Sequence, residues 1–427
     1  MKLKEVKPLD NHSIDSQSID SQSIDSHSVD SRLIDSHPTS VAPLEIVNAI
    51  LKSINKQKPV VGLHEPQFAG NEWQYLKDCL DSGWVSSVGQ YVNRFEQALQ
   101  DYTGVEHAIA VVNGTAALHI CLELAGVQSD DEVLLPALTF VATANAVSYC
   151  GAQPHFVDVD RETLGLDTLH LEAYLKEHAV IKDRKCYNRQ SQRRIRALIA
   201  VHTFGQPVDL EPLAALCEHY GITLIEDAAE SVGSFYHGRH TGNVGLLSAV
   251  SFNGNKIITT GGGGAVLTND GALAKYIRHI TTTAKLPHAW EFVHDQVAYN
   301  YRMPNINAAL GLSQLEQLDG FLASKRDLAE TYLRNFQTIG GVTVFKERAY
   351  ARSNYWLNVL MLNTASMDQR DLLLESCHDH GLHVRPVWRL LHKLPMYRSA
   401  PRMPLPVSEQ LEASIVCLPS SANLCPN

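Results

Sequence analysis

The chain has 427 residues, 44% of them apolar, and a formal net charge of −10. This length favours a large domain with a smaller one beside it, and the negative charge argues against a nucleic-acid-binding protein, which would carry a basic surface. No apolar run is long enough to predict a membrane span.

The cysteines and histidines point to no structural metal or disulfide framework. The eight cysteines are scattered without a Cys-x-x-Cys pair, and the twenty histidines show no metal-binding spacing. The N-terminal residues hold no apolar signal core. We therefore expect reduced thiols, a cytoplasmic protein and no metal site.

Residues 1–40 differ in kind from the rest of the chain. Aspartate recurs every five residues from Asp10 to Asp35, with one aliphatic residue in each repeat. A period of five matches neither a helix nor a strand, and isolated aliphatic residues cannot build a core. We predict a disordered low-complexity extension; a repeat that binds carbohydrate or a partner is the alternative.

From Pro43 onward the sequence predicts alternating helices and strands. Apolar spacing predicts three helices, at 44–55, 72–82 and 91–102, and then a regular alternation. The predicted strands are 107–112, 132–138, 155–160, 196–201, 222–227 and 248–252, and the helices between them are 116–126, 139–151, 168–178 and 209–221. Strands interleaved with helices indicate βαβ units and a mainly parallel sheet. Residues 181–194 are basic and polar, which predicts an exposed insertion.

The second half of the chain predicts a smaller α+β domain. A helix at 271–283 precedes a loop rich in His, Lys and aromatic residues, and a long helical period follows with a break at Gly320. Strands and helices alternate differently after about residue 341. We divide the chain into the extension, a large domain over 41–320 that includes the N-terminal helical segment, and a small domain over 321–427.

Four side chains follow predicted strand ends. These are Thr115, Phe140, Asp227 and Lys256. Parallel sheets bind ligands at the carboxyl ends of their strands. Each residue also has an ordinary explanation, as a helix cap, a core aromatic or a surface lysine, but four candidates at one edge indicate one site.

Lys256 stands between a short apolar strand and a run of four glycines, 261–264. It is the only charged residue of the stretch 248–266. Small and apolar neighbours solvate an amine poorly, which favours the neutral form that makes a Schiff base with an aldehyde.

An aldehyde cofactor such as pyridoxal phosphate would need four supports, and the sequence offers each of them. Asp227 is a carboxylate for the pyridine nitrogen, Phe140 a flat partner for the ring, and Glu230 a neighbour for the phenolic oxygen. A glutamate beside a phenolate is unfavourable unless it is protonated. Donors for the phosphate would come from the strand–turn–helix after residue 112 and from the turn before the lysine: Gly114, Thr115, Ser251 and Asn253.

At this point the chain resembles the DegT/DnrJ/EryC1/StrS family of pyridoxal-phosphate-dependent sugar aminotransferases, which have the fold-type I, aspartate aminotransferase-like architecture. The matching stretches are 83–92, 112–127, 136–147, 202–210, 225–234, 251–266 and 299–318. The resemblance implies that Lys256 carries the cofactor and moves the proton, and that Asn300 reaches the phosphate from the other subunit of a homodimer. Glu230 matches a position often held by Gln or His, and the glycine run lacks the Glu of a GEGG-like pattern.

Within the family, the chain is most similar to the aminotransferases of the legionaminic-acid pathway. The stretches that carry this likeness are 64–72, 83–89, 181–194, 298–302, 354–360 and 385–397. It implies L-glutamate as amino donor and a UDP- or GDP-linked 4-keto-6-deoxy-N-acetylglucosamine as acceptor, in bacterial surface-sugar biosynthesis. The residues expected near the substrate are Trp84, Ser86, Tyr301, Arg302, Arg385, Trp388 and His392.

Three alternatives stay open at this stage. A GDP-perosamine synthase would act on a related sugar without the N-acetyl group. A sugar dehydratase of the family would replace the lysine with histidine, so Lys256 argues against it. An idle sensor that binds the cofactor or sugar without turnover belongs to a different class, and the retention of Thr115, Asp227 and Lys256 argues against it.

Overall fold

The computed structural model describes residues 42–56 and 58–426, and the predicted extension over 1–40 lies outside them. In the described part of the chain, no helix is both long and apolar enough to cross a membrane.

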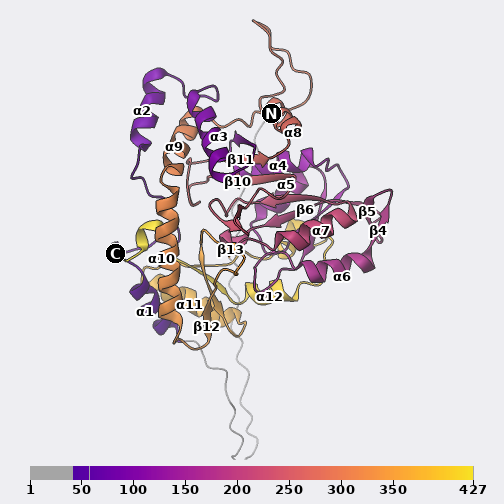
Figure 1. Cartoon of the computed structure of the whole chain (residues 1–427). Helices are drawn as coiled ribbons and strands as arrows, with labels where there is room; N and C mark the ends of the chain where they lie inside the picture. Colours follow the sequence, from indigo (N-terminus) through magenta and orange to yellow (C-terminus); the bar gives the residue numbers. More distant parts are fainter. Residues whose placement is uncertain (1–41, 57, 427) are drawn as a thin grey trace, which may run out of the picture. The chain divides into compact units, whose positions relative to one another are not determined.

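A nine-stranded sheet forms the centre of the large domain (Figure 1). Its main path runs β1-β11-β10-β7-β6-β2-β3, with the hairpin β4–β5 attached to β6. The strands β10, β7, β6, β2 and β3 are parallel, and β11 is antiparallel to both of its neighbours. The predicted mainly parallel sheet is therefore confirmed. The strand bounds are β1 His107–Val111, β2 Glu132–Pro136, β3 Gln153–Val157, β4 Ala179–Lys182, β5 Lys185–Asn188, β6 Arg194–Val201, β7 Thr223–Asp227, β10 Leu247–Ser251 and β11 Gly264–Thr268.

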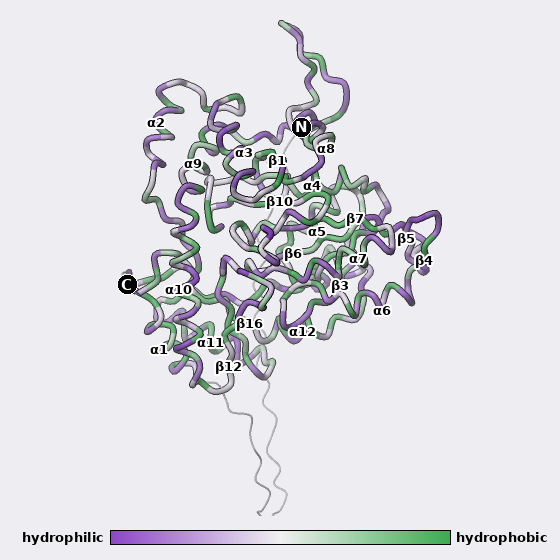
Figure 2. Tube along the Cα trace, viewed as in Figure 1, coloured by the Kyte–Doolittle hydropathy of each residue, from purple (hydrophilic) through white to green (hydrophobic). Residues whose placement is uncertain are grey.

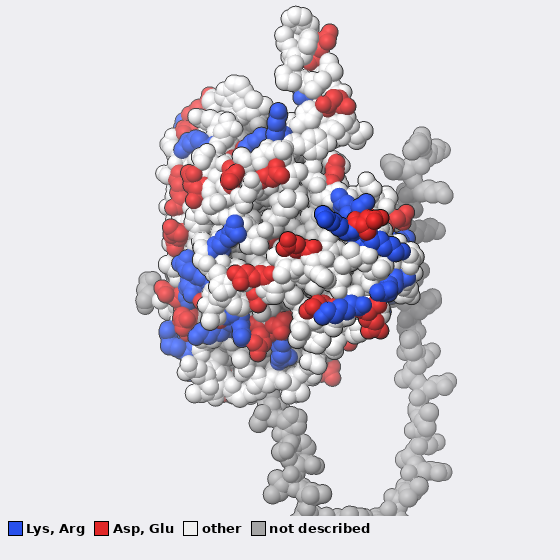
Figure 3. Space-filling model, turned by 45° about the vertical axis from the view of Figure 1, so that its right-hand side comes forward, with Lys and Arg blue, Asp and Glu red and all other residues white. Residues whose placement is uncertain are grey.

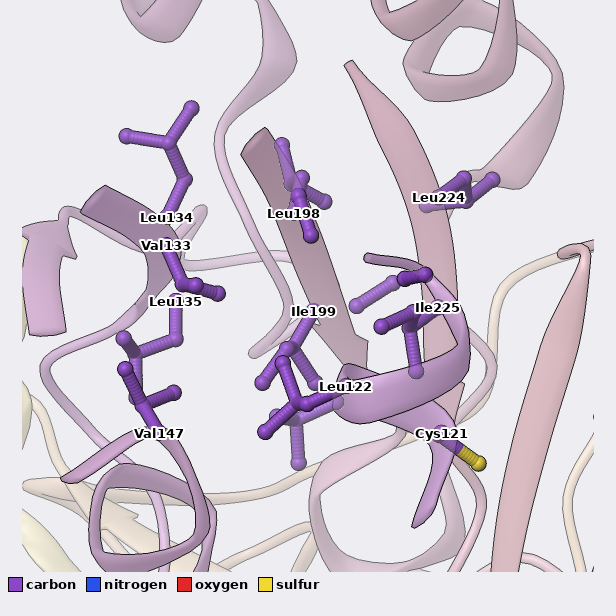
Figure 4. Close-up of a cluster of buried hydrophobic side chains, with 14 of the residues drawn as sticks. Cys121, Leu122, Val133, Leu134, Leu135, Val147, Leu198, Ile199, Leu224 and Ile225 are labelled. Carbon is purple, nitrogen blue, oxygen red and sulfur yellow. The ribbon is translucent and has the colours of Figure 1, made fainter. Parts of the chain in front are cut away.

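Helices pack on this sheet and bury its apolar strands. Figure 4 shows Leu122 of α4 beside Ile199 of β6, and Val147 of α5 near Leu135 of β2. All four side chains are fully buried, and burial of each such side chain stabilises the fold by roughly 1.5–3 kcal/mol. The covering helices are α4 Gly114–Leu124, α5 Val141–Tyr149, α6 Thr168–His178, α7 Leu210–Tyr220 and α8 Gly271–Thr281, with a short turn η1 Thr203–Gly205 after β6.

The basic insertion is a hairpin that the sheet holds in place. Strands β4 and β5 pair with each other, and β5 also pairs with β6 in the antiparallel direction. Ala179 and Asn188 are buried at its base, and Asn188 donates a hydrogen bond of 2.9 Å to Glu132. Its turn is hydrophilic (Figure 2), and lysine and arginine side chains gather on this side of the molecule (Figure 3). The insertion is therefore exposed at its turn but ordered at its base.

A second core forms between the sheet and three helices. These are α2 Glu72–Ser82, α3 Gln90–Thr103 and α9 Asn305–Leu315. The next helix, α10, spans Leu318–Phe336 without interruption, so the predicted break at Gly320 is wrong. The helical stretch is instead interrupted at Glu316–Gln317, between α9 and α10. Gly320 lies where an added Cβ would meet nothing within 4 Å, and burial of Phe321 and Leu322 outweighs the weak helix propensity of one glycine.

The C-terminal part forms an antiparallel sheet with the order β12-β14-β16-β15. Helix α1, Pro43–Ser53, packs here: its Ile46 and Ile50 join Leu328 and Tyr332 of α10 in one core. The division at residue 320, which groups α1 with the large domain, stays a prediction; within the structure α1 contacts the C-terminal part. The remaining bounds are β12 Val342–Val344, β14 Asn358–Leu362, β15 Arg385–Pro386, β16 Ile415–Leu418, α11 Met367–Asp379, α12 Pro406–Glu412, η2 Leu391–Lys393, η3 Pro395–Tyr397 and η4 Ala422–Leu424.

C-terminal segments return to the large domain in several places, two of which lie near the predicted site. Strand β13, Ala351–Arg352, pairs with β8, Phe235–Tyr236, which also pairs with β9, Arg239–His240. Farther on, Leu391 donates its backbone N–H to the carbonyl of Ala137 at 3.0 Å. These returns bring C-terminal side chains to the edge of the large sheet where the predicted site lies.

Candidate active site

The sheet register brings the ends of four strands together. Val111 and Ser251 both pair with Gly264, and Asp227 pairs with Val201 on one side and Ala249 on the other. The carboxyl ends of β1, β10, β7 and β6 therefore share one edge, as predicted for a parallel sheet.

The turn between β1 and α4 packs directly against the end of β10. Asn113 caps α4, because its side chain accepts a 2.7 Å hydrogen bond from the backbone N–H of Ala116. A Cβ added to Gly114 would lie 2.9 Å from the Cβ of Ser251. Only glycine fits this close approach, which places the free N–H groups at the start of α4 next to the Ser251 side chain.

A cavity of about 410 Å³ opens at this edge. It collects the predicted residues from the separate strand ends, together with residues of the C-terminal part. Eight of the residues predicted to bind the cofactor line it, as does one predicted substrate residue: Gly114, Thr115, Phe140, Asp227, Glu230, Ser251, Asn253, Lys256 and Trp388.

Lys256 lies in the turn after β10 and reaches into this cavity. Its Nζ is 3.5 Å from Oε1 of Glu230 and 4.1 Å from the centroid of the Trp356 ring. The indole N–H of Trp356 also donates 2.7 Å to the carbonyl of Asn255. The sequence predicts small and apolar neighbours for this amine. Tertiary contacts add a carboxyl group and an aromatic ring to them.

Asp227 ends β7 with a buried carboxyl group. It accepts hydrogen bonds from the Thr143 hydroxyl at 2.8 Å and from the backbone N–H of Ala229 at 3.2 Å. Burial raises the pKa of Asp227, and the hydrogen bond from Thr143 partly opposes this rise. A cationic group in the cavity would favour the ionised carboxylate.

Glu230 lies between the lysine and a strained turn. Phe204 has a φ of 58°, a left-handed conformation that is unusual for an aromatic residue. This conformation directs its backbone N–H to Oε2 of Glu230, at 2.8 Å. Burial raises the pKa of Glu230 to about 7, with Lys256 opposing the rise, so this group exchanges its proton near neutral pH.

Aromatic rings form one side of the cavity. Phe140 lines it with 51% of its surface exposed, and its ring centroid is 6.3 Å from that of Trp388. Trp388 in turn stacks on Phe204 at 5.1 Å. An aromatic face that is left open in a cavity is suited to stack against a flat ligand.

Sequence reasoning missed two important residues of the cavity. Thr143 could have been found, because it follows Phe140 by three positions in a predicted helix and so lies on the same face. Trp356 could not, because it comes from the C-terminal part and its position depends on the packing between distant segments.

The remaining predicted residues lie outside this cavity. Asn300 and Ser86 are exposed, and Trp84 is 59% exposed on the loop after α2. Tyr301 stacks on Tyr299 at 4.8 Å.

Three further predicted substrate residues have other surroundings. Arg302 is partly buried, and its Nη1 donates to Glu96 at 2.7 Å and to the carbonyl of Ala110 at 2.9 Å, so it is held outside the cavity. His392 is buried in η2, with Nε2 3.7 Å from Glu409. Arg385 is exposed and lines a neighbouring cavity.

Comparison with known proteins identifies the family. The model of the DegT/DnrJ/EryC1/StrS aminotransferase family matches residues 66–427. GDP-perosamine synthase of Escherichia coli O157:H7 is 37% identical over 364 residues, which cover 85% of this chain and 94% of that protein. The Vibrio cholerae GDP-perosamine synthase is 36% identical over 367 residues, covering 86% and 95%. Among solved structures, Helicobacter pylori PseC, an aminotransferase involved in pseudoaminic acid biosynthesis, is 26% identical with a TM-score of 0.77, covering 85% of this chain and 94% of that one.

The fold and the match together define the class of enzyme. The chain belongs to the DegT/DnrJ/EryC1/StrS aminotransferase family. It is a sugar aminotransferase that uses pyridoxal phosphate, and the predicted family, fold and cofactor are confirmed. The finer likeness to legionaminic-acid enzymes stays a prediction.

Proposed function

We propose that the enzyme transfers an amino group from L-glutamate to C4 of a nucleotide-linked 4-keto-6-deoxy sugar. The observation that carries this proposal is the position of Lys256, which places an amine in a cavity that also holds a buried carboxyl group, an open aromatic face and a helix N-terminus. These are the groups that pyridoxal phosphate requires, so the residues present fit the cofactor.

Each cofactor contact is part of the proposal. The start of α4, with Gly114 and Thr115, and the turn with Ser251 and Asn253 would hold the phosphate through N–H and hydroxyl donors. Asp227 would pair with the pyridine nitrogen, and Phe140 would cover one ring face. When bound, the cofactor supplies an electron sink that makes the donor Cα–H acidic.

Lys256 would move the proton. Its Nζ is the one amine among the residues that line the cavity. Trp356 limits where that amine can go, because its ring covers Nζ and its indole N–H fixes the carbonyl of Asn255. A held amine that takes a proton from one carbon and returns it to another acts as a general base and then a general acid.

Glu230 would serve as a neutral acid. An ionised carboxylate next to the phenolic oxygen of the cofactor is disfavoured by like charge, whereas a protonated one can donate a hydrogen bond. Its pKa, raised by burial to about 7, makes the protonated form available below neutral pH.

We further propose a homodimer in which the partner completes the site. Large apolar side chains are exposed on the loop after α2 and on the loop that projects beyond α8 (Figure 1), including Trp84, Val88, Trp290 and Phe292. Extensive exposed apolar surface marks interaction sites. A second copy would bring Asn300 to the phosphate and the Trp84–Ser86 loop to the substrate.

Two acceptors are candidates for the same chemistry. The predicted acceptor is a 4-keto-6-deoxy sugar with an N-acetyl group at C2, linked to UDP or GDP. The second candidate is the GDP-linked sugar that lacks this group, and it is favoured by the identity of 36–37% to GDP-perosamine synthases.

We place the enzyme in the cytoplasm, because all eight cysteines are free thiols, which suits a reducing compartment.

An absorbance spectrum between 300 and 500 nm tests the proposal. We expect the purified protein to show the band of lysine-bound cofactor, L-glutamate to bleach it, and one of the two keto-sugar nucleotides to restore it. Restoration by the N-acetylated sugar alone would reject the perosamine alternative. A protein that binds the cofactor but never changes its spectrum with any amino donor would instead be the idle sensor.

A further inference from the structure

A second cavity, of about 580 Å³, adjoins the cofactor cavity. The two share three lining residues, Asn255, Trp356 and Trp388. Asn255 directly precedes Lys256, and Trp356 covers its amine, so the second cavity begins where the reacting amine lies. We use "second cavity" for the space lined by Leu63, His64, Phe204, Asn255, Trp356, Leu357, Arg385, Pro386, Val387, Trp388, Arg389 and Cys417.

The lining of the second cavity is basic. Arg385 and Arg389 are exposed at its rim, and no aspartate or glutamate lines it. Neither guanidinium lies within 4.0 Å of a carboxylate of the described residues, whereas Arg302 and Arg370, whose side chains are 8% exposed, are paired. Unpaired guanidinium groups beside a reaction site are suited to bind an anionic part of a substrate.

His64 adds a polar group whose only polar neighbour of note is the backbone of Asn255, which opposes the lowering of its pKa without forming a well-aligned hydrogen bond. Neither of its ring nitrogens has a hydrogen-bond partner among the described residues, although both are buried. Burial lowers the pKa of His64 well below its usual range, and the nearby Lys325 and Lys256 lower it further. The imidazole is therefore neutral, with one nitrogen able to donate and the other able to accept. Buried polar atoms without partners call for an explanation such as a ligand or water.

We propose that the second cavity binds the carboxylates of the amino donor, with Arg385 and Arg389 as its cationic groups and His64 as a neutral hydrogen-bonding group. This inference rests on the proposed function and names the site of its donor. The sequence predicts Arg385 near the substrate, and this inference assigns it to the amino donor.

Geometry favours the donor over the nucleotide as the source of the anion. In an amino acid the carboxylate is attached to the same carbon as the reacting amine, so its site must adjoin the reaction site. In a nucleotide sugar the diphosphate is separated from C4 by the pyranose ring. The shared wall at Asn255 and Trp356 gives the short separation that the amino acid requires, and two guanidinium groups match the two carboxylates of a dicarboxylic donor.

Rapid mixing of the holoenzyme with L-glutamate tests the inference. The rate of bleaching of the cofactor band, followed against L-glutamate concentration, gives the apparent Kd of the first half-reaction. We expect Arg385→Gln and Arg389→Gln each to raise this Kd about 10-fold to 100-fold, which is the loss typical of removing a charge-assisted hydrogen bond. The apparent KM for the keto-sugar nucleotide should change less than twofold. Arg348→Gln is the matched control, because Arg348 is a surface arginine paired with Glu162.

A second measurement reads binding without turnover. Glutarate has both carboxylates but no amine, so it cannot react; it should compete with L-glutamate on the wild type and lose affinity in both arginine variants. His64→Leu should weaken glutarate about tenfold, with partial recovery in His64→Gln.

The outcomes separate the two proposals. Unchanged glutamate and glutarate binding in both arginine variants overturns the donor site and leaves the aminotransferase function intact. A rise in the nucleotide-sugar KM alone likewise overturns it and assigns the cavity to the diphosphate. A wild-type spectrum that L-glutamate does not alter would instead reject the proposed donor itself.

Discussion

Two regions of this enzyme enclose a lysine side chain and surround it differently. In the cofactor cavity, Lys256 keeps 13% of its side chain exposed and faces a carboxyl group and an indole ring. In α10, Lys325 is fully buried and donates to the backbone carbonyls of Trp356, at 3.2 Å, and Ser420. Burial lowers the pKa of Lys325 well below its usual range.

The difference shows that burial alone does not make an amine functional. Lys325 is the more deeply buried of the two, yet it lines neither cavity and its donors are used on backbone carbonyls. Lys256 has access to a space that a ligand can enter. Substitutions in the first region should therefore affect chemistry, and those in the second should affect stability.

Lys256→Ala should produce the largest effect. Without the amine there is no covalent attachment and no group to move the proton, so we expect kcat to fall by at least about 10³-fold. The unfolding midpoint should stay close to that of the wild type. The absorbance spectrum and circular dichroism check both expectations, with the exposed Lys275→Ala as control. Normal turnover would remove Lys256 from its proposed role.

Asp227→Asn should have the second largest effect on activity. An amide cannot keep the pyridine nitrogen protonated, so we expect kcat to fall on the order of 10²- to 10³-fold while the protein stays folded. Single-turnover kinetics with L-glutamate measure this step directly. Wild-type rates in this variant would mean that another group supports the ring nitrogen.

Lys325→Met should affect stability rather than chemistry. The change leaves two buried carbonyls without their donor, which costs roughly 1–3 kcal/mol, and kcat should change less than tenfold. Urea unfolding measures the loss. A large fall in kcat with unchanged stability would contradict the distinction between the two lysines.

The pH dependence of unfolding sharpens this test. At pH values between the lowered pKa of Lys325 in the folded protein and the ordinary pKa of lysine, Lys325 is protonated in the unfolded chain and neutral in the folded one. Wild-type stability should therefore gain a contribution that rises with pH across this window. Lys325→Met should lose this rise.

Glu230→Gln should have the smallest effect. Glutamine keeps the shape and a donor without the proton equilibrium, so we expect less than a tenfold change in kcat/KM at pH 6. In the wild type, burial raises the pKa of Glu230 to about 7. The wild type should therefore lose activity above about pH 7, where the carboxyl ionises, and the variant should not. Identical pH profiles would show that Glu230 acts in some other form.

Much of the large domain could be predicted from the sequence, because local signals agree with the global fold. Apolar strands, helical spacing and the rule for parallel sheets were enough to bring Thr115, Phe140, Asp227 and Lys256 to one edge. Eight predicted cofactor residues line the cavity for this reason.

The C-terminal contribution could not be predicted in the same way. Strands such as β15 have two residues, too few for a period to be read. Trp356 reaches the cavity through long-range packing, and His64 lines the second cavity although the stretch 64–72, which it begins, gave it no chemical role. The helix break predicted at Gly320 was wrong because an isolated glycine weakens a helix less than the burial of its neighbours strengthens it.

Helix α10 has a consequence for how the molecule unfolds. Its first turns hold Phe321 and Leu322 in the core beneath the large sheet, and its later turns hold Leu328 and Tyr332 in the core shared with α1. Because one continuous helix contributes to both cores, unfolding of one core should destabilise the other. We therefore expect residues 42–426 to melt in one cooperative transition, and a fragment cut at residue 320 to lose structure on both sides of the cut.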